Sequence, residues 1–193
     1  MKCDKQHMLL YAVTDRAWTG KQTLYEQVEA ALKGGVTCVQ LREKELDETA
    51  FLQEAKELCA LCRRYGVPFL VNDNVEIAIA CGADGIHVGQ EDLAAGEVRR
   101  RVGENMILGV SVHTVEEACQ AVRDGADYLG LGAVFPTDRC GADVQRNLAG
   151  DLRRGGCAHC GHRRHQPGQY SQAGRQRRGR RGSGVGHLLG GGH

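Results

Sequence analysis

Small clusters of polar residues follow five short apolar runs in the first two thirds of this 193-residue chain. They combine closely spaced cations, separated aspartates and neutral hydrogen-bonding groups, which is what binding a diphosphate together with Mg²⁺ requires. Polar residues at the carboxyl ends of parallel strands are also where α/β barrels carry their active sites, so the pattern predicts an enzyme. The clusters are Gln40-Leu41-Arg42-Glu43-Lys44, Asn72-Asp73, Gln90-Glu91-Asp92, Ser111-Val112-His113 and Pro136-Thr137.

Charge suggests how the members of such a site would divide the work. Arg42 and Lys44 lie two positions apart, so both side chains can face one side of a strand end and clamp phosphate oxygens. Asp73 and Asp92 are the predicted Mg²⁺ ligands, with phosphate oxygens completing the octahedron. Departure of a diphosphate leaves a cationic fragment, so electrostatic positioning should matter more than a general base.

Plainer interpretations compete with each of these assignments. A strand-end aspartate is often a helix cap, and Arg42 and Lys44 could pair with neighbouring glutamates at a solvated edge. His113 follows Ser111 by two positions, a spacing that does not by itself make a nucleophile and base, so a structural role is favoured. His87, inside an apolar run, is interpreted as a core histidine, and Asp15-Arg16 could reach the mouth of the site or lie outside it.

Alternating strand and helix patterns supply the elements that would position the clusters. Strands are predicted at residues 9–13, 36–41, 69–71, 85–88, 107–110 and 128–131. Helices are predicted at residues 23–32, 47–64, 75–80, 93–102 and 114–122, with Asp47 and Thr114 as N-caps. About six βα units are recognisable, and a (βα)₈ TIM barrel needs eight, so the last two strands are missing from the pattern.

The clusters, in this order and spacing, resemble the thiamine phosphate synthase family over roughly residues 8–138. The resemblance implies a TIM barrel that joins hydroxymethylpyrimidine diphosphate to thiazole phosphate with Mg²⁺, releasing pyrophosphate. It implies catalytic roles for Arg42, Lys44 and Ser111, and a contact between Thr137 and the thiazole phosphate. The substrate-binding residues that it implies are Gln40, Leu41, Arg42, Glu43, Lys44, Asn72, Ser111 and Thr137.

Residues 139–193 differ in composition from residues 1–138, which are interpreted as the barrel domain. They hold 11 arginines, no lysine and only two acidic residues, for a net charge of +9 against −8 upstream. They also hold 14 glycines and no Ile or Phe, so they lack the residues that build strands and cores. This segment is therefore interpreted as an aberrant tail that does not complete the barrel.

A shift of reading frame between Asp138 and Asn147 accounts for this tail. Synonymous codons for residues 162–173, read one nucleotide later, can spell IGGINQDNILKL, and the text that follows can spell AGSGVDGVAVVSAIFWAAD. Both strings resemble the seventh and eighth strands of the family. Here Arg139-Cys140 stand where the family continues to a threonine and a lysine that approach the diphosphate, so this chain is expected to be poorly active.

Two other functions are considered. A thiazole tautomerase-like barrel would share the fold but needs neither the carboxylates nor the full clamp from Gln40 to Lys44. A zinc or nucleic-acid module in the tail would use Cys157, His159, Cys160 or the run Arg175 to Arg181, yet the ligands are too crowded for a finger and no aromatic residues interleave the run.

The remaining expectations concern partners and location. Small-molecule substrates are expected, without nucleic acid or membrane, because no apolar run approaches the ~20 residues of a membrane span. The apolar run at residues 8–13 is too short for a signal peptide, and nine cysteines without a repeating frame do not indicate a disulfide scaffold. A cytoplasmic location is therefore predicted.

Overall fold

The computed structural model describes residues 3–131. Six strands, each joined to the next through a helical segment, form one parallel sheet in the order β1-β2-β3-β4-β5-β6. The strands are β1 (Tyr11–Val13), β2 (Cys38–Leu41), β3 (Phe69–Asn72), β4 (Gly85–Val88), β5 (Ile107–Val112) and β6 (Tyr128–Leu131). The α-helices are α1 (Leu24–Lys33), α2 (Glu48–Tyr65), α3 (Val75–Cys81), α4 (Ala95–Val102) and α5 (Val115–Arg123), and two 3₁₀ turns lie at Lys5–Met8 and Arg16–Trp18.

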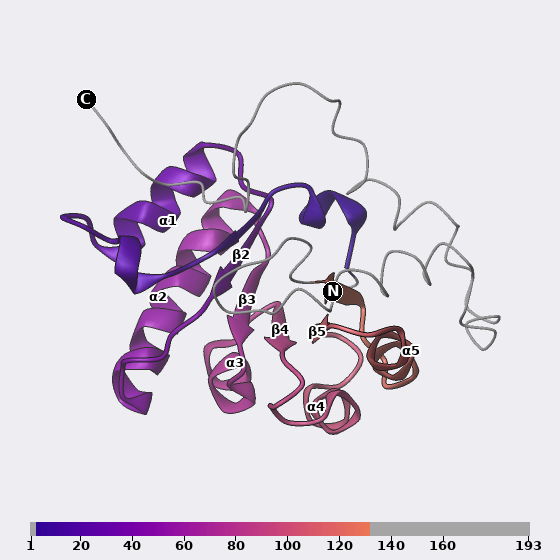
Figure 1. Ribbon diagram of the computed structural model, residues 1–193. Coiled ribbons are helices and arrows are strands. Elements are labelled where there is room, and N and C mark those ends of the chain that lie inside the picture. Colours follow the sequence, from indigo (N-terminus) through magenta and orange to yellow (C-terminus); the bar gives the residue numbers. More distant parts are fainter. Residues whose placement is uncertain (1–2, 132–193) are drawn as a thin grey trace.

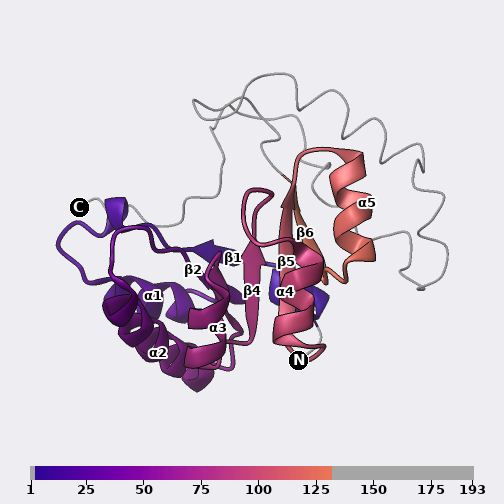
Figure 2. The same cartoon turned by 90° about the horizontal axis from the view of Figure 1, so that it is seen from below.

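The sheet curls, and the helices lie along its outer face (Figure 1). After a turn of 90°, α4 and α5 are seen beside β5 and β6 (Figure 2). The curl brings the two edge strands together across the inner face, where the Tyr11 and Tyr128 hydroxyls are 2.7 Å apart. Six consecutive parallel strands, with helices between them, that curl in this way correspond to the first six strands of the predicted barrel fold. Thr137, the remaining barrel residues up to 138, and the tail from 139 to 193 lie outside the described residues.

Alternation along each strand divides the side chains between two cores. The outward-facing residues, such as Val39, Val71 and Val110, are fully or almost fully buried against the helices. The inward-facing Cys38, Leu70 and Ile107 form a second cluster, against which Tyr11 and Tyr128 pack. On β2 and β3 the next inward positions are Gln40 and Asn72, and on β5 Ser111 follows Gly109, so polar groups lie toward the carboxyl end of the sheet.

Helix starts follow the predicted capping residues closely. Asp47 accepts a hydrogen bond from the backbone N–H of Ala50, and Thr114 forms a reciprocal capping box with Glu117. The helix predicted from residue 93 instead begins at Ala95, because Ala94 has an extended backbone and no side chain that can cap. The first strand begins at Tyr11 rather than residue 9, since the backbone N–H of Leu10 donates to the Thr37 hydroxyl.

One difference from the predicted strands affects the site. The fifth strand continues two residues beyond residue 110 and ends at Val112. Ser111 therefore lies within the sheet, paired in register with Gly130 of β6, and not in the loop that follows. Its side chain faces inward, toward β4 and the interior of the curled sheet.

Candidate functional site

Polar side chains from neighbouring strands meet at the carboxyl end of the sheet. Gln40 near the end of β2 is buried, and its amide N–H donates to the Asn72 carbonyl oxygen over 3.0 Å. That bond leaves the Asn72 amide N–H groups available as donors at the end of β3. The sequence prediction that Gln40 and Asn72 share one site is supported by this contact.

Asp73 follows Asn72 in an unusual backbone conformation, with φ of 64°. This left-handed region costs energy for most side chains, and aspartate and asparagine tolerate it better than others. The backbone N–H of Asp73 is held by the His87 carbonyl of β4 at 2.8 Å. The turn therefore directs the Asp73 carboxylate sideways into the mouth of the site rather than outward.

Asp73 and Asp92 lie side by side, although they come from different loops. Partial burial, together with the hydrogen bond and negative charge of Asp92, raises the pKa of Asp73 to about 6, and Lys44 and Arg42 partly oppose the rise. Asp92 is itself oriented by the Gly89 backbone N–H, 2.6 Å from its carboxylate oxygen. Two carboxylates and two cations predicted from separated stretches of sequence are thus within electrostatic range of one another.

The carboxylate pair can be tested for its fit to a metal ion. Among residues 3–131 no group of three or more His, Cys, Asp or Glu side chains converges as a closed metal site. The repulsion that helps to raise the pKa of Asp73 would be relieved by a divalent cation between the two carboxylates, and Mg²⁺ is commonly held by one or two carboxylates plus substrate phosphates. Asp73 and Asp92 fit Mg²⁺ in that open arrangement, and their role as ligands stays a prediction.

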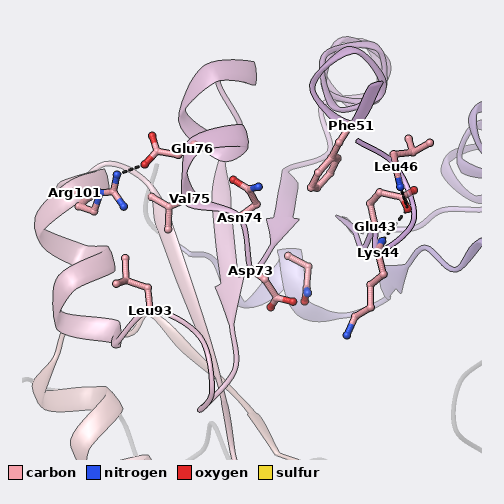
Figure 3. A pocket seen from close by; sticks show the side chains of 11 residues that line it. Glu43, Lys44, Leu46, Phe51, Asp73, Asn74, Val75, Glu76, Leu93 and Arg101 are labelled. Atoms are coloured by element: carbon pink, nitrogen blue, oxygen red, sulfur yellow. Dashed lines mark hydrogen bonds and ion pairs between the residues drawn. The ribbon is translucent and has the colours of Figure 1, made fainter. Parts of the chain in front are cut away.

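An open cavity of about 550 Å³ adjoins this mouth. Figure 3 shows Lys44 and Asp73 on its border, Phe51 and Leu93 on its walls, and the Glu76–Arg101 ion pair at the far rim. Only part of the predicted site lines it: Lys44, Asn72 and Asp73 do, whereas Gln40, Arg42 and Asp92 do not. The cavity is therefore the outer approach to the carboxylate and cation cluster.

The structure gives two residues of the predicted clamp different roles from substrate binding. The Leu41 side chain is fully buried in the core between sheet and helices, so it packs and does not face a ligand. The Glu43 carboxylate is 1% exposed and paired with Arg16. It also accepts backbone N–H bonds from Lys44, Glu45 and Leu46, so its acceptor sites serve the loop that carries Lys44.

Arg16 is the residue from the first loop whose position the sequence left open. Its guanidinium bridges Glu43 and Glu54, the latter at 2.6 Å. Although burial opposes ionisation of Glu43, hydrogen bonds from Glu45, Arg16 and Leu46 hold the pKa of its carboxyl below the ordinary value. Arg16 thus fixes the loop after β2 from outside, while Asp15 caps the short 3₁₀ turn through the Ala17 N–H.

Ser111 has a histidine partner, which is not the one next to it in sequence. His87 Nε2 lies 2.8 Å from the Ser111 hydroxyl, and His87 Nδ1 lies 2.8 Å from the Tyr128 hydroxyl. Burial lowers the pKa of His87 to about 4, against the charge of Asp92. His113 instead lies 3.4 Å from Glu117 on α5, in agreement with the structural role predicted for it.

Sequence analysis placed His87 in the core and did not consider Tyr128 or Tyr11. The signal that could have found them is the two-residue alternation of β4 and β6, which puts His87 and Tyr128 on the inward face shared with Ser111. Glycines make the contact possible: a Cβ at Gly109 would lie 2.1 Å from the Tyr128 ring, and one at Gly130 would lie 3.1 Å from His87.

None of the described helices is long and apolar enough to cross a membrane.

Comparisons with known proteins bear on the same residues. The family model described as thiamine monophosphate synthase matches residues 10–149. A thiamine-phosphate synthase of Clostridium tetani is 50% identical over 129 residues, which are 67% of this chain and 62% of that protein. A probable thiamine biosynthetic bifunctional enzyme of rice is 52% identical over 132 residues, covering 67% of this chain and 24% of the relative.

A solved structure is similar to this chain in both fold and sequence. The thiamine phosphate pyrophosphorylase from Pyrococcus furiosus superposes with a TM-score of 0.63 and 40% identity, over 69% of this chain and 64% of that one. The chain thus spans less than two thirds of the length of each of these proteins. The family match at residues 10–149 includes all six described strands and the five α-helices between them, and it ends well before residue 193. This chain belongs to the thiamine monophosphate synthase family.

Proposed function

We propose that the protein acts as a thiamine-phosphate synthase, joining hydroxymethylpyrimidine diphosphate to thiazole phosphate and releasing pyrophosphate. The observation that carries this proposal is the meeting of Asp73 and Asp92 with Arg42 and Lys44 at the carboxyl end of the sheet. The names of the similar proteins support it. The cytoplasmic location stays a prediction.

The reaction breaks the bond between the pyrimidine methylene carbon and the diphosphate oxygen, whose electron pair leaves with the pyrophosphate. A new bond forms from the thiazole nitrogen to the same carbon. Arg42 would hold the diphosphate by paired hydrogen bonds and Lys44 by its point charge, both strengthening as negative charge develops. Asn72, with its carbonyl held by Gln40, would donate to the pyrimidine ring or to phosphate.

Mg²⁺ would be held by Asp73 and Asp92, and when bound it would neutralise charge on the departing pyrophosphate. Ser111, on the inner face of β5, would donate a hydrogen bond to the same diphosphate. Thr137 is proposed to contact the thiazole phosphate, and it lies outside the described residues. A thiazole tautomerase-like barrel has no need of the paired aspartates, so their contact in this fold favours the synthase.

Product formation tests the proposal. The purified chain is mixed with both substrates and Mg²⁺, and thiamine phosphate is measured after chromatographic separation. In a second protein, residues 139–193 are replaced by the amino-acid sequence that the shifted reading frame encodes. We expect slow or undetectable turnover by the chain as it stands and Mg²⁺-dependent turnover by the restored chain. Failure of the restored chain to form any thiamine phosphate, although folded, would refute the assignment.

A further inference from the structure

Four side chains on the inner face of the sheet form a continuous hydrogen-bonded chain. It runs from Tyr11 on β1 to Tyr128 on β6 (2.7 Å), then to His87 on β4 (2.8 Å), then to Ser111 on β5 (2.8 Å). Tyr11 and Tyr128 are the first residues of their strands, whereas Ser111 is one residue from the end of β5. The chain therefore leads from the amino end of the sheet toward the site mouth.

The packing around this chain is built to admit it. Gly109 faces Tyr128 in the strand register, and any side chain there would overlap the phenol ring. Gly130 faces Ser111 in the same register and leaves space for the imidazole of His87. The rings of Tyr11 and Tyr128 have centroids 6.0 Å apart, and those of His87 and Tyr128 5.5 Å apart. Each ring is thereby held with its polar atom toward the next.

The hydrogen bonds that link these four side chains can run in either of two directions. In one, Tyr11 donates to Tyr128, Tyr128 donates to His87 Nδ1, and His87 Nε2–H donates to Ser111. The Ser111 proton is then directed outward. In the other direction every donor and acceptor is exchanged. His87 then carries its proton on Nδ1, and the Ser111 hydroxyl donates to His87 Nε2.

The two ends of the chain decide between these directions. The side-chain hydrogen bond of Tyr11 is made to Tyr128, so in the reversed direction its partly buried hydroxyl proton would find no acceptor among residues 3–131. An unpaired donor in such a place costs about 1–3 kcal/mol. At the other end, a diphosphate can only accept hydrogen bonds, so the reversed direction would also present it with serine lone pairs.

We propose that Tyr11, Tyr128 and His87 act as positioning residues that fix the Ser111 hydroxyl as a hydrogen-bond donor toward an anionic diphosphate. The inference deepens the proposed function and rests on it for the identity of the ligand, whereas the tautomer of His87 can be measured in the ligand-free protein. His87 acts through Ser111 and does not touch the ligand. Because the donor is set before the ligand binds, no reorientation is needed on binding.

The tautomer of His87 tests the direction. Ring nitrogen signals of the full-length, ¹⁵N-histidine-labelled chain are recorded by long-range ¹H–¹⁵N correlation without ligand, and His87 is assigned from a His87→Gln sample. We expect a protonated Nε2 and an unprotonated Nδ1. In Tyr128→Phe, which removes the donor to Nδ1, we expect a mixture of tautomers. A protonated Nδ1 in the unaltered chain would overturn the proposal.

Binding of pyrophosphate tests whether Tyr11, Tyr128 and His87 act through Ser111. Pyrophosphate with Mg²⁺ is titrated calorimetrically into the unaltered chain, Tyr128→Phe, Ser111→Ala and the double variant, with Tyr25→Phe on the outer face as the matched control. We expect Tyr128→Phe to weaken binding about 3- to 10-fold, in keeping with one net hydrogen bond, and to have no further effect once Ser111 is alanine. Equal losses in both backgrounds would contradict coupling through Ser111.

The readouts separate this inference from the function it assumes. If the unaltered protein does not bind pyrophosphate, the assignment of the diphosphate site fails. The tautomer of His87 still decides the direction of the hydrogen bonds from Tyr11 to Ser111. His87→Gln supplies a rescue, because its amide N–H can still donate to Ser111. We expect it to bind pyrophosphate more tightly than His87→Leu, and equal affinities would count against His87 as the donor.

Discussion

Asp73 shows how one residue combines strain and electrostatics at the site mouth. Its left-handed backbone and its contact with Asp92 both cost stability, and both direct a carboxylate toward the cations of the loop after β2. Costs of this kind persist where surrounding structure imposes them, and they concentrate at functional sites. The residue is thus better suited to holding a cation than to stabilising the fold.

The cost at Asp73 should depend on pH. Its native pKa of about 6 exceeds the ordinary value, so its contribution to stability is present below about pH 4 and is lost as pH rises through 6. Asp73→Asn keeps the turn and removes the repulsion. We expect it to be more stable than the unaltered chain by about 1 kcal/mol at pH 7, after allowance for solvent screening, with no gain near pH 4.

Urea unfolding between pH 4 and 8 without metal measures this difference. Glu57→Gln, on the exposed face of α2, removes one negative charge elsewhere and serves as the control. A gain for Asp73→Asn that is the same at every pH would show that the carboxylate pair is not its source.

Glu43 illustrates a charged residue of the sequence motif whose side chain serves the scaffold. Glu43→Ala removes the partner of Arg16 and of three backbone N–H groups, so we expect a loss of about 2–4 kcal/mol in the free energy of unfolding. Denaturant unfolding of the ligand-free chain measures it. Unchanged stability together with lost diphosphate binding would instead make Glu43 a ligand contact. Glu45→Ala, two residues further along the same loop and exposed, is the control.

At the scale of elements, the sequence predicted much of what is observed because local signals were strong. Helix α2 begins and ends where its cap at Asp47 and its glycine at Gly66 require, and β4 and β6 have the predicted bounds. The alternation of inward and outward residues follows from the strands themselves. The placement of Asp73 beside Asp92 then follows from parallel strands that share one carboxyl edge.

What the sequence could not provide depends on register and on close approach between strands. The pairing of Ser111 with His87, 24 residues earlier, needs the alignment of β4 with β5 and the extension of β5 past residue 110. The sequestration of Glu43 by Arg16 depends on how two loops meet, and no periodic pattern reports that. Closeness in sequence does not report such a pair, since His113, two positions after Ser111, lies beside Glu117, in agreement with the structural role predicted for it.

Packing between β5 and β6 offers a test at this scale. Gly109→Ala would place a methyl group 2.1 Å from the Tyr128 ring, so the ring or the strand must move. We expect destabilisation of about 2–3 kcal/mol or more, measured by chemical denaturation, and loss of the ordered His87 tautomer. Gly96→Ala in helix α4, whose new methyl would meet the end of the Asp124 side chain no closer than 3.3 Å, should change stability by no more than about 1 kcal/mol. Equal effects of the two would contradict the close packing.

At the scale of the molecule, the six strands place the cations and the carboxylates of the proposed diphosphate site on the described part of the chain. Cations come from the loop after β2 and carboxylates from the loops after β3 and β4. If these residues hold Mg²⁺ and diphosphate as proposed, neighbouring units of the curled sheet suffice to assemble that side, whereas Thr137 belongs to the predicted thiazole phosphate side. This division predicts that diphosphate binding is separable from turnover.

Calorimetric titration of pyrophosphate into the purified full-length chain, with and without Mg²⁺, tests the central claim most directly. We expect saturable binding that requires Mg²⁺ and weakens at least 10-fold in Asp92→Asn and in Lys44→Ala, with Glu57→Gln unchanged. Binding of equal strength without Mg²⁺, or indifference to both substitutions, would contradict a metal-bound diphosphate held between these carboxylates and cations.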